Sequence, residues 1–220
     1  MLAPTLVLLL AQAPASAAPA ASPTPRPAPA GPVVVLDTSA GRIRVGLHQD
    51  KAPGTVANFL KYVRSGHYDG TVFHRVIPNF MIQGGGMDAS LNEKPTLAPI
   101  RNEARNRLRN LRGTVAMART NDPDSAAAQF FINLRDNAPL DFGVSAGYAV
   151  FGEVLEGMDV VDRIAAVRTT TRGHLRDVPE TAVVLRTARV VSGAKPAAAS
   201  PRPRPSARSP RPSPRPSARP

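Results

Sequence analysis

The pattern of apolar and polar residues along the domain predicts mostly strands. Residues 33–38 and 42–48 are two β-prone runs joined by a short Ser-Ala-Gly connection. In the second run, apolar side chains at 43, 45 and 47 alternate with Arg42, Arg44 and Gly46, which is typical of a strand with one face in water. We therefore expect a hairpin at the start of the domain.

Six further β-prone runs follow, and only two stretches have helical periodicity. The strand candidates are residues 71–77, 80–84, 114–119, 129–134, 149–154 and 181–191. From Pro53 to Arg64 the apolar residues recur at i, i+3, i+4 and i+7, with Gly66 just past the end, and residues 158–167 repeat this pattern more weakly. Such an order does not suit β-α-β repeats. It predicts a mainly β fold, a closed eight-stranded antiparallel β-barrel capped by two α-helices.

The start of the chain has a different composition from this domain. Residues 1–17 hold an apolar stretch too short to span a bilayer, followed by an A-x-A-like site. These features predict a signal peptide and a periplasmic or secreted location. No Lys or Arg precedes the stretch, so a disordered leader stays an alternative. Residues 18–32 are a Pro/Ala-rich linker, and the globular domain is expected at 33–192.

Residues 193–220 form a basic tail rich in Pro, Arg and Ser, which we expect to be disordered. The last twenty residues contain six arginines and no acid, and supply half of the net charge of +12. One interpretation is a flexible, solvated end. The other is docking to an anionic envelope surface, such as wall polymers or lipid headgroups, or to nucleic acid. We expect no specific nucleic-acid partner, and a monomer.

Motifs for several other chemistries are incomplete. There is no cysteine, which excludes disulfides and thiol chemistry. The sequence GVSAG at 143–147 matches a hydrolase nucleophile elbow, but a β-prone run follows it instead of a helix. The glycines at 84–86 lack phosphate-loop spacing, and the four histidines are scattered. The five arginines of 101–113 are interpreted as a solvated loop, with an anion-binding patch as the alternative. We expect no metal and no cofactor.

Arg75 is an unusual residue because it lies inside an otherwise apolar strand candidate with no acid nearby in sequence. A simple period of two places Phe73, Arg75 and Ile77 on one face of that strand. The same period places Met81 and Gln83 together on the next strand. Apolar groups beside a few hydrogen-bonding groups are typical of a small-molecule or peptide pocket, although an arginine pointing into water is the alternative.

Several ordered motifs show a resemblance to a known family. "FHRVIPNFMIQGGG" at 73–86, with "AMAR", "SAAAQFFI" and "AVFGEVLEGMDVVD", resembles the cyclophilin-type peptidyl-prolyl cis-trans isomerases, most closely the bacterial exported (periplasmic) type. The resemblance covers nearly the whole domain. The family fold is an eight-stranded antiparallel barrel with two capping helices, in line with the strand count above.

The resemblance implies a pocket for a proline ring, with Arg75 donating a hydrogen bond to the prolyl nitrogen in the twisted state. Gln83 and Gln129 would hold the substrate carbonyl or position Arg75, and backbone groups of Ala118 and Arg119 would pair with the substrate. The implied catalytic residues are Arg75 and Gln83, and the implied substrate-binding residues are Phe80, Met81, Ala118, Arg119, Gln129, Phe131, Leu140 and Tyr148.

Three positions depart from the family pattern. Many members have a tryptophan, linked to cyclosporin binding, directly before the pocket leucine, and this chain has Pro139 there. We therefore expect weak cyclosporin binding. Tyr148 replaces a histidine that is common in eukaryotic members, and Arg119 replaces a common asparagine.

The resemblance implies a peptidyl-prolyl cis-trans isomerase that rotates X-Pro bonds in unfolded or partly folded exported proteins. The alternative is a non-catalytic chaperone or scaffold that binds proline segments and is tethered by its basic tail. The presence of Arg75 beside apolar pocket residues favours the enzyme.

Overall fold

The computed structural model describes residue 29 and residues 31–191. The predicted signal peptide, the basic tail and most of the linker lie outside the described residues. The elements are β1 (Val33–Thr38), β2 (Gly41–Leu47), α1 (Pro53–Arg64), β3 (Thr71–Ile77), β4 (Met81–Gly84), β5 (Thr114–Met117), β6 (Phe130–Asn133), β7 (Val150–Glu156), α2 (Met158–Ala165), β8 (Thr169–Arg172), β9 (Leu175–Pro179) and β10 (Val184–Val191), with 3₁₀ turns at Ala104–Asn106 and Ala138–Leu140.

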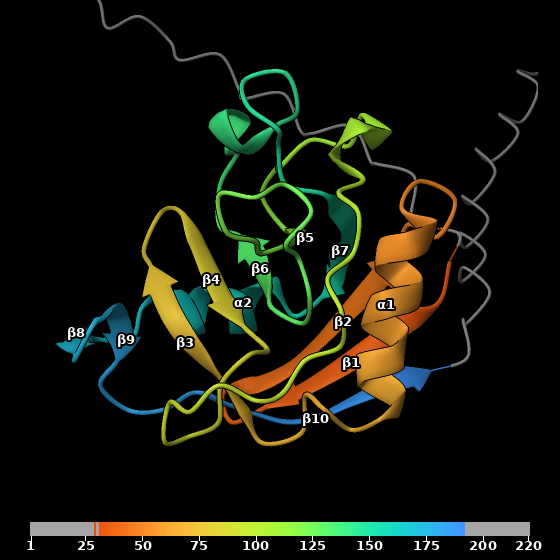
Figure 1. Cartoon of the computed structure of the whole chain (residues 1–220). Helices are drawn as coiled ribbons and strands as arrows, with labels where there is room; N and C mark the ends of the chain where they lie inside the picture. The colour runs from red at the N-terminus through yellow and green to blue at the C-terminus, as the bar shows by residue number, and fades with distance from the viewer. Residues whose placement is uncertain (1–28, 30, 192–220) are drawn as a thin grey trace, which may run out of the picture.

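Eight of these strands close into an antiparallel barrel in the order β1-β10-β3-β4-β6-β5-β7-β2 (Figure 1). They are the eight strands that the hydrophobic pattern predicts, with ends shifted by a few residues. Both predicted helices are present, and their apolar faces join the main core. The mainly β barrel with two helices is therefore confirmed. Within the described residues, neither helix has the length and apolar character to cross a membrane.

The strands β8 and β9 were not predicted. They form a separate two-stranded sheet that packs beside β3 (Figure 1). Each has only four or five residues, and most of their side chains remain at least partly exposed. β8 consists of Thr and Arg alone and β9 ends in a proline, so neither short strand gives a clear alternation that would separate it from a loop.

The predicted face of β3 is wrong at one point, because a β-bulge interrupts the strand. Phe73 lies opposite Gly84, whereas Arg75 lies opposite Gln83, so His74 is an extra residue. One extra residue reverses the alternation of every side chain beyond it. Phe73 consequently points into the barrel core, whereas Arg75 points outward.

The N-terminus of α1 is capped by a residue that is distant in sequence. The N-cap position gives no side-chain hydrogen bond, and there is no acidic residue in the first turn. Instead the Glu103 carboxylate accepts hydrogen bonds from the amides of Gly54 at 3.0 Å and Thr55 at 2.7 Å, and from the Thr55 hydroxyl at 2.6 Å. A carboxylate at this position satisfies free backbone donors and interacts favourably with the helix dipole.

We predict that Glu103→Ala lowers the free energy of unfolding by roughly 1–2 kcal/mol, the usual effect of losing a helix cap. Urea titration followed by circular dichroism would measure it. Glu180→Ala is the matched control, because within the described residues the Glu180 side chain makes only an exposed ion pair with Arg168 at 3.6 Å, and we expect its effect to stay within about 0.5 kcal/mol. Equal effects of the two substitutions would contradict a capping role.

The bulge residue His74 is buried, and its Nδ1 atom has no hydrogen-bond partner among the described residues. Burial lowers the pKa of its imidazole, and the neighbouring positive charge of Arg75 lowers it further. In the unfolded chain the His74 imidazole should therefore take up a proton near pH 6.5. In the folded chain the same imidazole stays neutral at that pH.

This difference predicts a domain that loses stability as the pH falls below about 6.5, with a slope of up to about 1.4 kcal/mol per pH unit for this group. Above that pH both states carry a neutral imidazole and the contribution is constant. His74→Gln should make the stability less dependent on pH. The pH dependence that remains should come from His67, because burial lowers the pKa of that imidazole too. Urea titrations at pH 5.5 and pH 8 would test this, and an unchanged slope in His74→Gln would refute it.

Candidate active site

A second, smaller apolar cluster lies on the outside of the barrel. Because side chains alternate along a strand, residues next to core positions on β4 to β7 point outward. Four of these outward residues are nonetheless buried: Met81, Ala116, Phe131 and Val150. Phe80, Leu140 and Tyr148, which lie outside these strands, pack against them. An outward barrel face that would normally be wet thus becomes the floor of a pocket.

The structure gathers nine of the ten predicted site residues around one cavity of about 160 Å³. The lining residues are Arg75, Phe80, Met81, Gln83, Ala118, Arg119, Phe131, Leu140 and Tyr148. The tenth, Gln129, lines an adjoining cavity that shares Gln83, Ala118 and Arg119. Residues from 75 to 148 along the chain therefore meet at one place on the barrel surface.

Aromatic and cationic groups build one wall of this cavity. Phe131 and Tyr148 meet edge to face, with ring centroids 5.6 Å apart. The Arg119 guanidinium lies over the Tyr148 ring, 4.3 Å from its centroid. Arg119 Nε donates to the Gly147 carbonyl at 3.1 Å and Nη1 to the Thr120 carbonyl at 2.8 Å. These contacts fix the Arg119 side chain as part of the wall.

Of the two backbone groups of Ala118 that could pair with a substrate, the amide is already in use. The Ala118 amide already donates to the Gln129 carbonyl at 3.0 Å. Any pairing of a peptide with Ala118 would therefore use the Ala118 carbonyl. The Gln129 side chain is also engaged, because its Oε1 atom accepts a hydrogen bond from Gln83 Nε2 at 2.8 Å.

Arg75 stands at the rim of the cavity with 45% of its side chain exposed. Although its neighbours in sequence are apolar, Arg75 is thus partly exposed. Its Nε atom lies 3.7 Å from Oδ2 of Asp177 in β9. Sequence reasoning missed Asp177, because a partner about a hundred residues away leaves no local signal.

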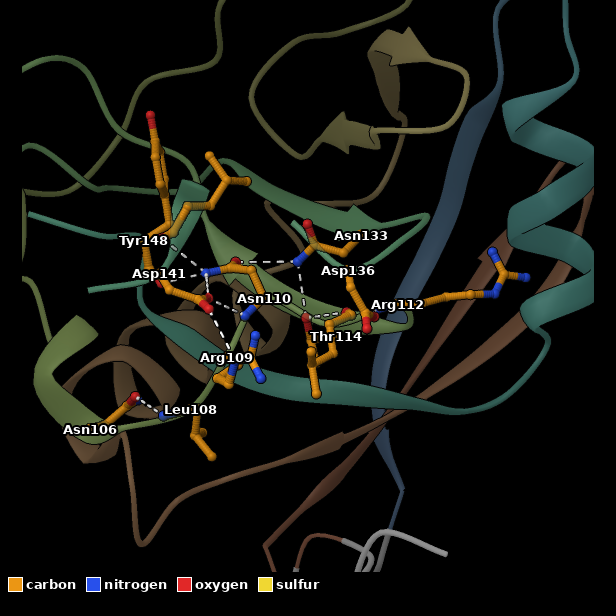
Figure 2. Close-up of polar contacts among 12 residues, drawn as sticks. Asn106, Leu108, Arg109, Asn110, Arg112, Thr114, Asn133, Asp136, Asp141 and Tyr148 are labelled. Atoms are coloured by element: carbon orange, nitrogen blue, oxygen red, sulfur yellow. Dashed lines mark hydrogen bonds and ion pairs between the residues drawn. The ribbon is translucent and has the colours of Figure 1, made fainter. Parts of the chain in front are cut away.

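Three buried asparagines, Asn110, Asn133 and Asn137, form hydrogen bonds beneath the pocket wall. The sequence did not indicate this role for them. Asn133 Nδ2 donates to Asn110 Oδ1 at 3.2 Å and to Thr114 Oγ1 at 2.9 Å, and Asn137 Nδ2 donates to Asn133 Oδ1 at 2.7 Å. Figure 2 shows Asn110 between Asn133 and Asp141. Buried amides in such a chain fix one another's orientation.

This asparagine network reaches the backbone of three pocket residues. Asn137 donates to the Phe80 carbonyl at 2.9 Å, and Asn110 donates to the Leu140 carbonyl at 3.0 Å and to the Tyr148 carbonyl at 3.4 Å. The Tyr148 amide in turn donates to the Leu140 carbonyl at 2.9 Å. The loops that carry the wall are thus held by directed bonds from the barrel.

Other candidate chemistries have ordinary structural roles. Ser145 of the GVSAG sequence accepts a hydrogen bond from the Gly147 amide inside a loop. In the arginine-rich segment, Arg109 pairs with Asp141 and Arg112 with Asp162. In the part of the chain that the structure describes, no three His, Asp or Glu side chains are grouped to hold a metal ion.

Comparison with known proteins agrees with this architecture. The family model "Cyclophilin type peptidyl-prolyl cis-trans isomerase/CLD" matches residues 33–190. A peptidyl-prolyl cis-trans isomerase of Streptomyces antibioticus is 60% identical over 163 residues, covering 72% of this chain and 98% of that protein. Peptidyl-prolyl cis-trans isomerase A of Dickeya dadantii is 53% identical over 159 residues, covering 72% of this chain and 84% of that protein.

Solved structures share the fold. A Cryptosporidium parvum cyclophilin, crystallised in the presence of the dipeptide Ala-Pro, superposes with a TM-score of 0.62 at 23% identity, covering 73% of this chain and 99% of that one. A cyclophilin from Hirschia baltica gives a TM-score of 0.60 at 29% identity, covering 74% of this chain and 75% of that one. The family match, the close relatives and the barrel agree: the chain belongs to the cyclophilin-type peptidyl-prolyl cis-trans isomerases, which catalyse rotation about X-Pro peptide bonds.

Proposed function

We propose that the outer-face cavity binds the proline ring of the substrate and that Arg75 acts on the prolyl nitrogen. The observation that carries this proposal is that one small cavity combines an apolar floor, Met81 and Phe131, with a guanidinium at its rim. Its volume of about 160 Å³ is small beside the roughly 300–1,000 Å³ of typical ligand pockets, which suits a single small ring.

The chemistry follows from amide resonance. Conjugation of the nitrogen lone pair with the carbonyl gives a rotation barrier of roughly 18–20 kcal/mol. When the bond twists, conjugation is lost and the lone pair becomes a hydrogen-bond acceptor. A donor held at the nitrogen by Arg75 therefore stabilises the twisted state more than the planar ground state, which is the condition for acceleration.

This single interaction does not supply the whole rate enhancement. A charge-assisted hydrogen bond contributes roughly 1.5–3 kcal/mol, whereas a 10⁶-fold acceleration requires about 8 kcal/mol. The remainder is assigned to moving the amide from water onto the apolar floor and to holding the residues that flank proline. The side chains of Gln83 and Gln129 share a hydrogen bond of 2.8 Å, and their proposed role is to hold the substrate carbonyl or to position Arg75.

In the cell, the proposed substrates are X-Pro segments of exported proteins that are unfolded or partly folded. The apolar stretch and cleavage-like site of residues 1–17 support export to the periplasm or beyond. The arginines of the tail support an anionic envelope surface as a second partner. Fractionation of cells producing the full chain or a chain ending at residue 192, at low salt, tests this second partner. Identical distributions would count against docking.

We predict that Arg75→Ala reduces kcat/KM for a short X-Pro peptide roughly 10- to 150-fold, the equivalent of one charge-assisted hydrogen bond. A protease-coupled isomerisation assay would measure it, with circular dichroism to show that the variant is folded. Arg44→Ala is the control, because Arg44 pairs with Glu156 on β2 and β7 and does not line the cavity. A folded Arg75→Ala protein with wild-type activity would exclude the proposed role.

Weak cyclosporin binding is a second expectation from the site. Pro139 is exposed in the 3₁₀ turn before Leu140 and provides neither an indole ring nor an N–H donor. We expect Pro139→Trp to bind cyclosporin at least about tenfold more tightly than the wild type, a gain of ~1.4 kcal/mol. Calorimetric titration of both proteins would show this. Tight binding by the wild type would contradict the expectation.

A further inference from the structure

Arg75 owes its outward direction to the bulge in β3. His74 is the extra residue between Phe73 and Arg75, so the guanidinium leaves the core and reaches the rim of the proline cavity. A long side chain that is 45% exposed has many rotamers available. A catalytic donor, by contrast, must stay at one position relative to the substrate nitrogen. Some group is therefore needed to restrict Arg75.

A second bulge brings an acidic residue to this point. In the β8–β9 pair, Thr170 lies opposite Val178 and Arg172 opposite Leu175, so β9 has one more residue than β8 in this interval. Asp177 lies in this interval and adopts a left-handed backbone with φ of 60°. Bulges of this kind redirect side chains and are frequent beside active sites. The irregularities of β3 and β9 thus place Arg75 and Asp177 face to face.

The hairpin that carries Asp177 is fixed against β3. Val178 is buried, and β9 packs against β3. Within the hairpin, the Glu180 amide donates to the Arg168 carbonyl at 2.9 Å. The carboxylate is therefore presented by a packed element next to the strand that carries Arg75.

We propose that Asp177 is a positioning residue that holds the Arg75 guanidinium in its catalytic orientation. This proposal rests on the role proposed above for Arg75. The Asp177 carboxylate lies 3.7 Å from Nε of Arg75, and no other acidic side chain in the described chain forms an ion pair with Arg75. Contact at the Nε edge leaves the two Nη groups available to the substrate. The pair restricts the rotamers of Arg75 without occupying the donors of its two Nη groups.

The expected effect is modest, because both side chains are partly in water. Asp177 is 40% exposed, and exposed ion pairs change an equilibrium by about 1.4- to 5-fold. Removing the charge should lower the rate at which bound peptide isomerises by about two- to fivefold. Peptide affinity should not change, since Asp177 does not line the cavity.

The variant that isolates the charge is Asp177→Asn, because asparagine has nearly the same shape and tolerates the left-handed backbone. Line-shape analysis of NMR spectra of an X-Pro peptide with the full chain yields both the affinity and the isomerisation rate on the enzyme. Relaxation of the ¹⁵Nε nucleus of Arg75 reports the order of the side chain directly. The proposal expects a lower rate, unchanged affinity and a more mobile Arg75.

Two further comparisons complete the test. Asp162→Asn is the matched control, because Asp162 pairs with Arg112 at 2.8 Å, is 49% exposed and does not line the cavity. It should leave the rate unchanged. In an Arg75→Ala background, Asp177→Asn should have no further effect, because a positioning residue acts only through the residue that it positions.

The outcomes separate the two proposals. If Arg75→Ala retains the full rate, the catalytic role of Arg75 fails, whatever Asp177 does. If Arg75→Ala loses activity but Asp177→Asn equals the wild type, or is faster, only the positioning role is overturned. A loss of affinity at constant rate, or an equal loss with and without Arg75, also overturns it.

Discussion

One extra residue in a barrel strand is the feature on which the active site depends. The interior of a closed barrel must be filled by alternate side chains, so a regular β3 would direct Arg75 inward if Phe73 is inside. The bulge at His74 allows Phe73 and Val76 to remain in the core while Arg75 turns outward. Because burial lowers the pKa of His74, the same residue also contributes a pH-dependent term to stability.

Placing the site on the outside of the barrel separates it from the core that stabilises the fold. The floor residues Met81 and Phe131 belong to the outer cluster, whereas their neighbours Ile82 and Phe130 belong to the interior. Substitutions at the wall can therefore alter ligand preference at a smaller cost in stability than substitutions inside. The asparagine network connects the outer site to the barrel. Asn133 is buried in β6, and its hydrogen bonds to Asn110 and Asn137 reach the pocket loops.

The β-prone runs predicted all eight barrel strands, and the amphipathic pattern predicted α1 with its observed bounds. These features depend on local composition and spacing, which the sequence displays directly. The bulge at His74 and the β8–β9 hairpin were not predicted, because neither changes the local composition. The pocket residues were identified through family resemblance, and the structure brings nine of them to one cavity. Asp177 and the cap by Glu103 join residues distant in sequence, so only the folded chain reveals them.

The pairing of β1 with β10 has a consequence for how the domain is made. Val33 lies opposite Val191, so the barrel closes between nearly the first and last residues of the domain. During synthesis β1 can pair with β2, but its other side lacks its native partner until β10 has been made. Contacts between such distant residues slow folding and leave strand sides exposed in the meantime. The barrel of the nascent domain therefore cannot close until its final strand has been made.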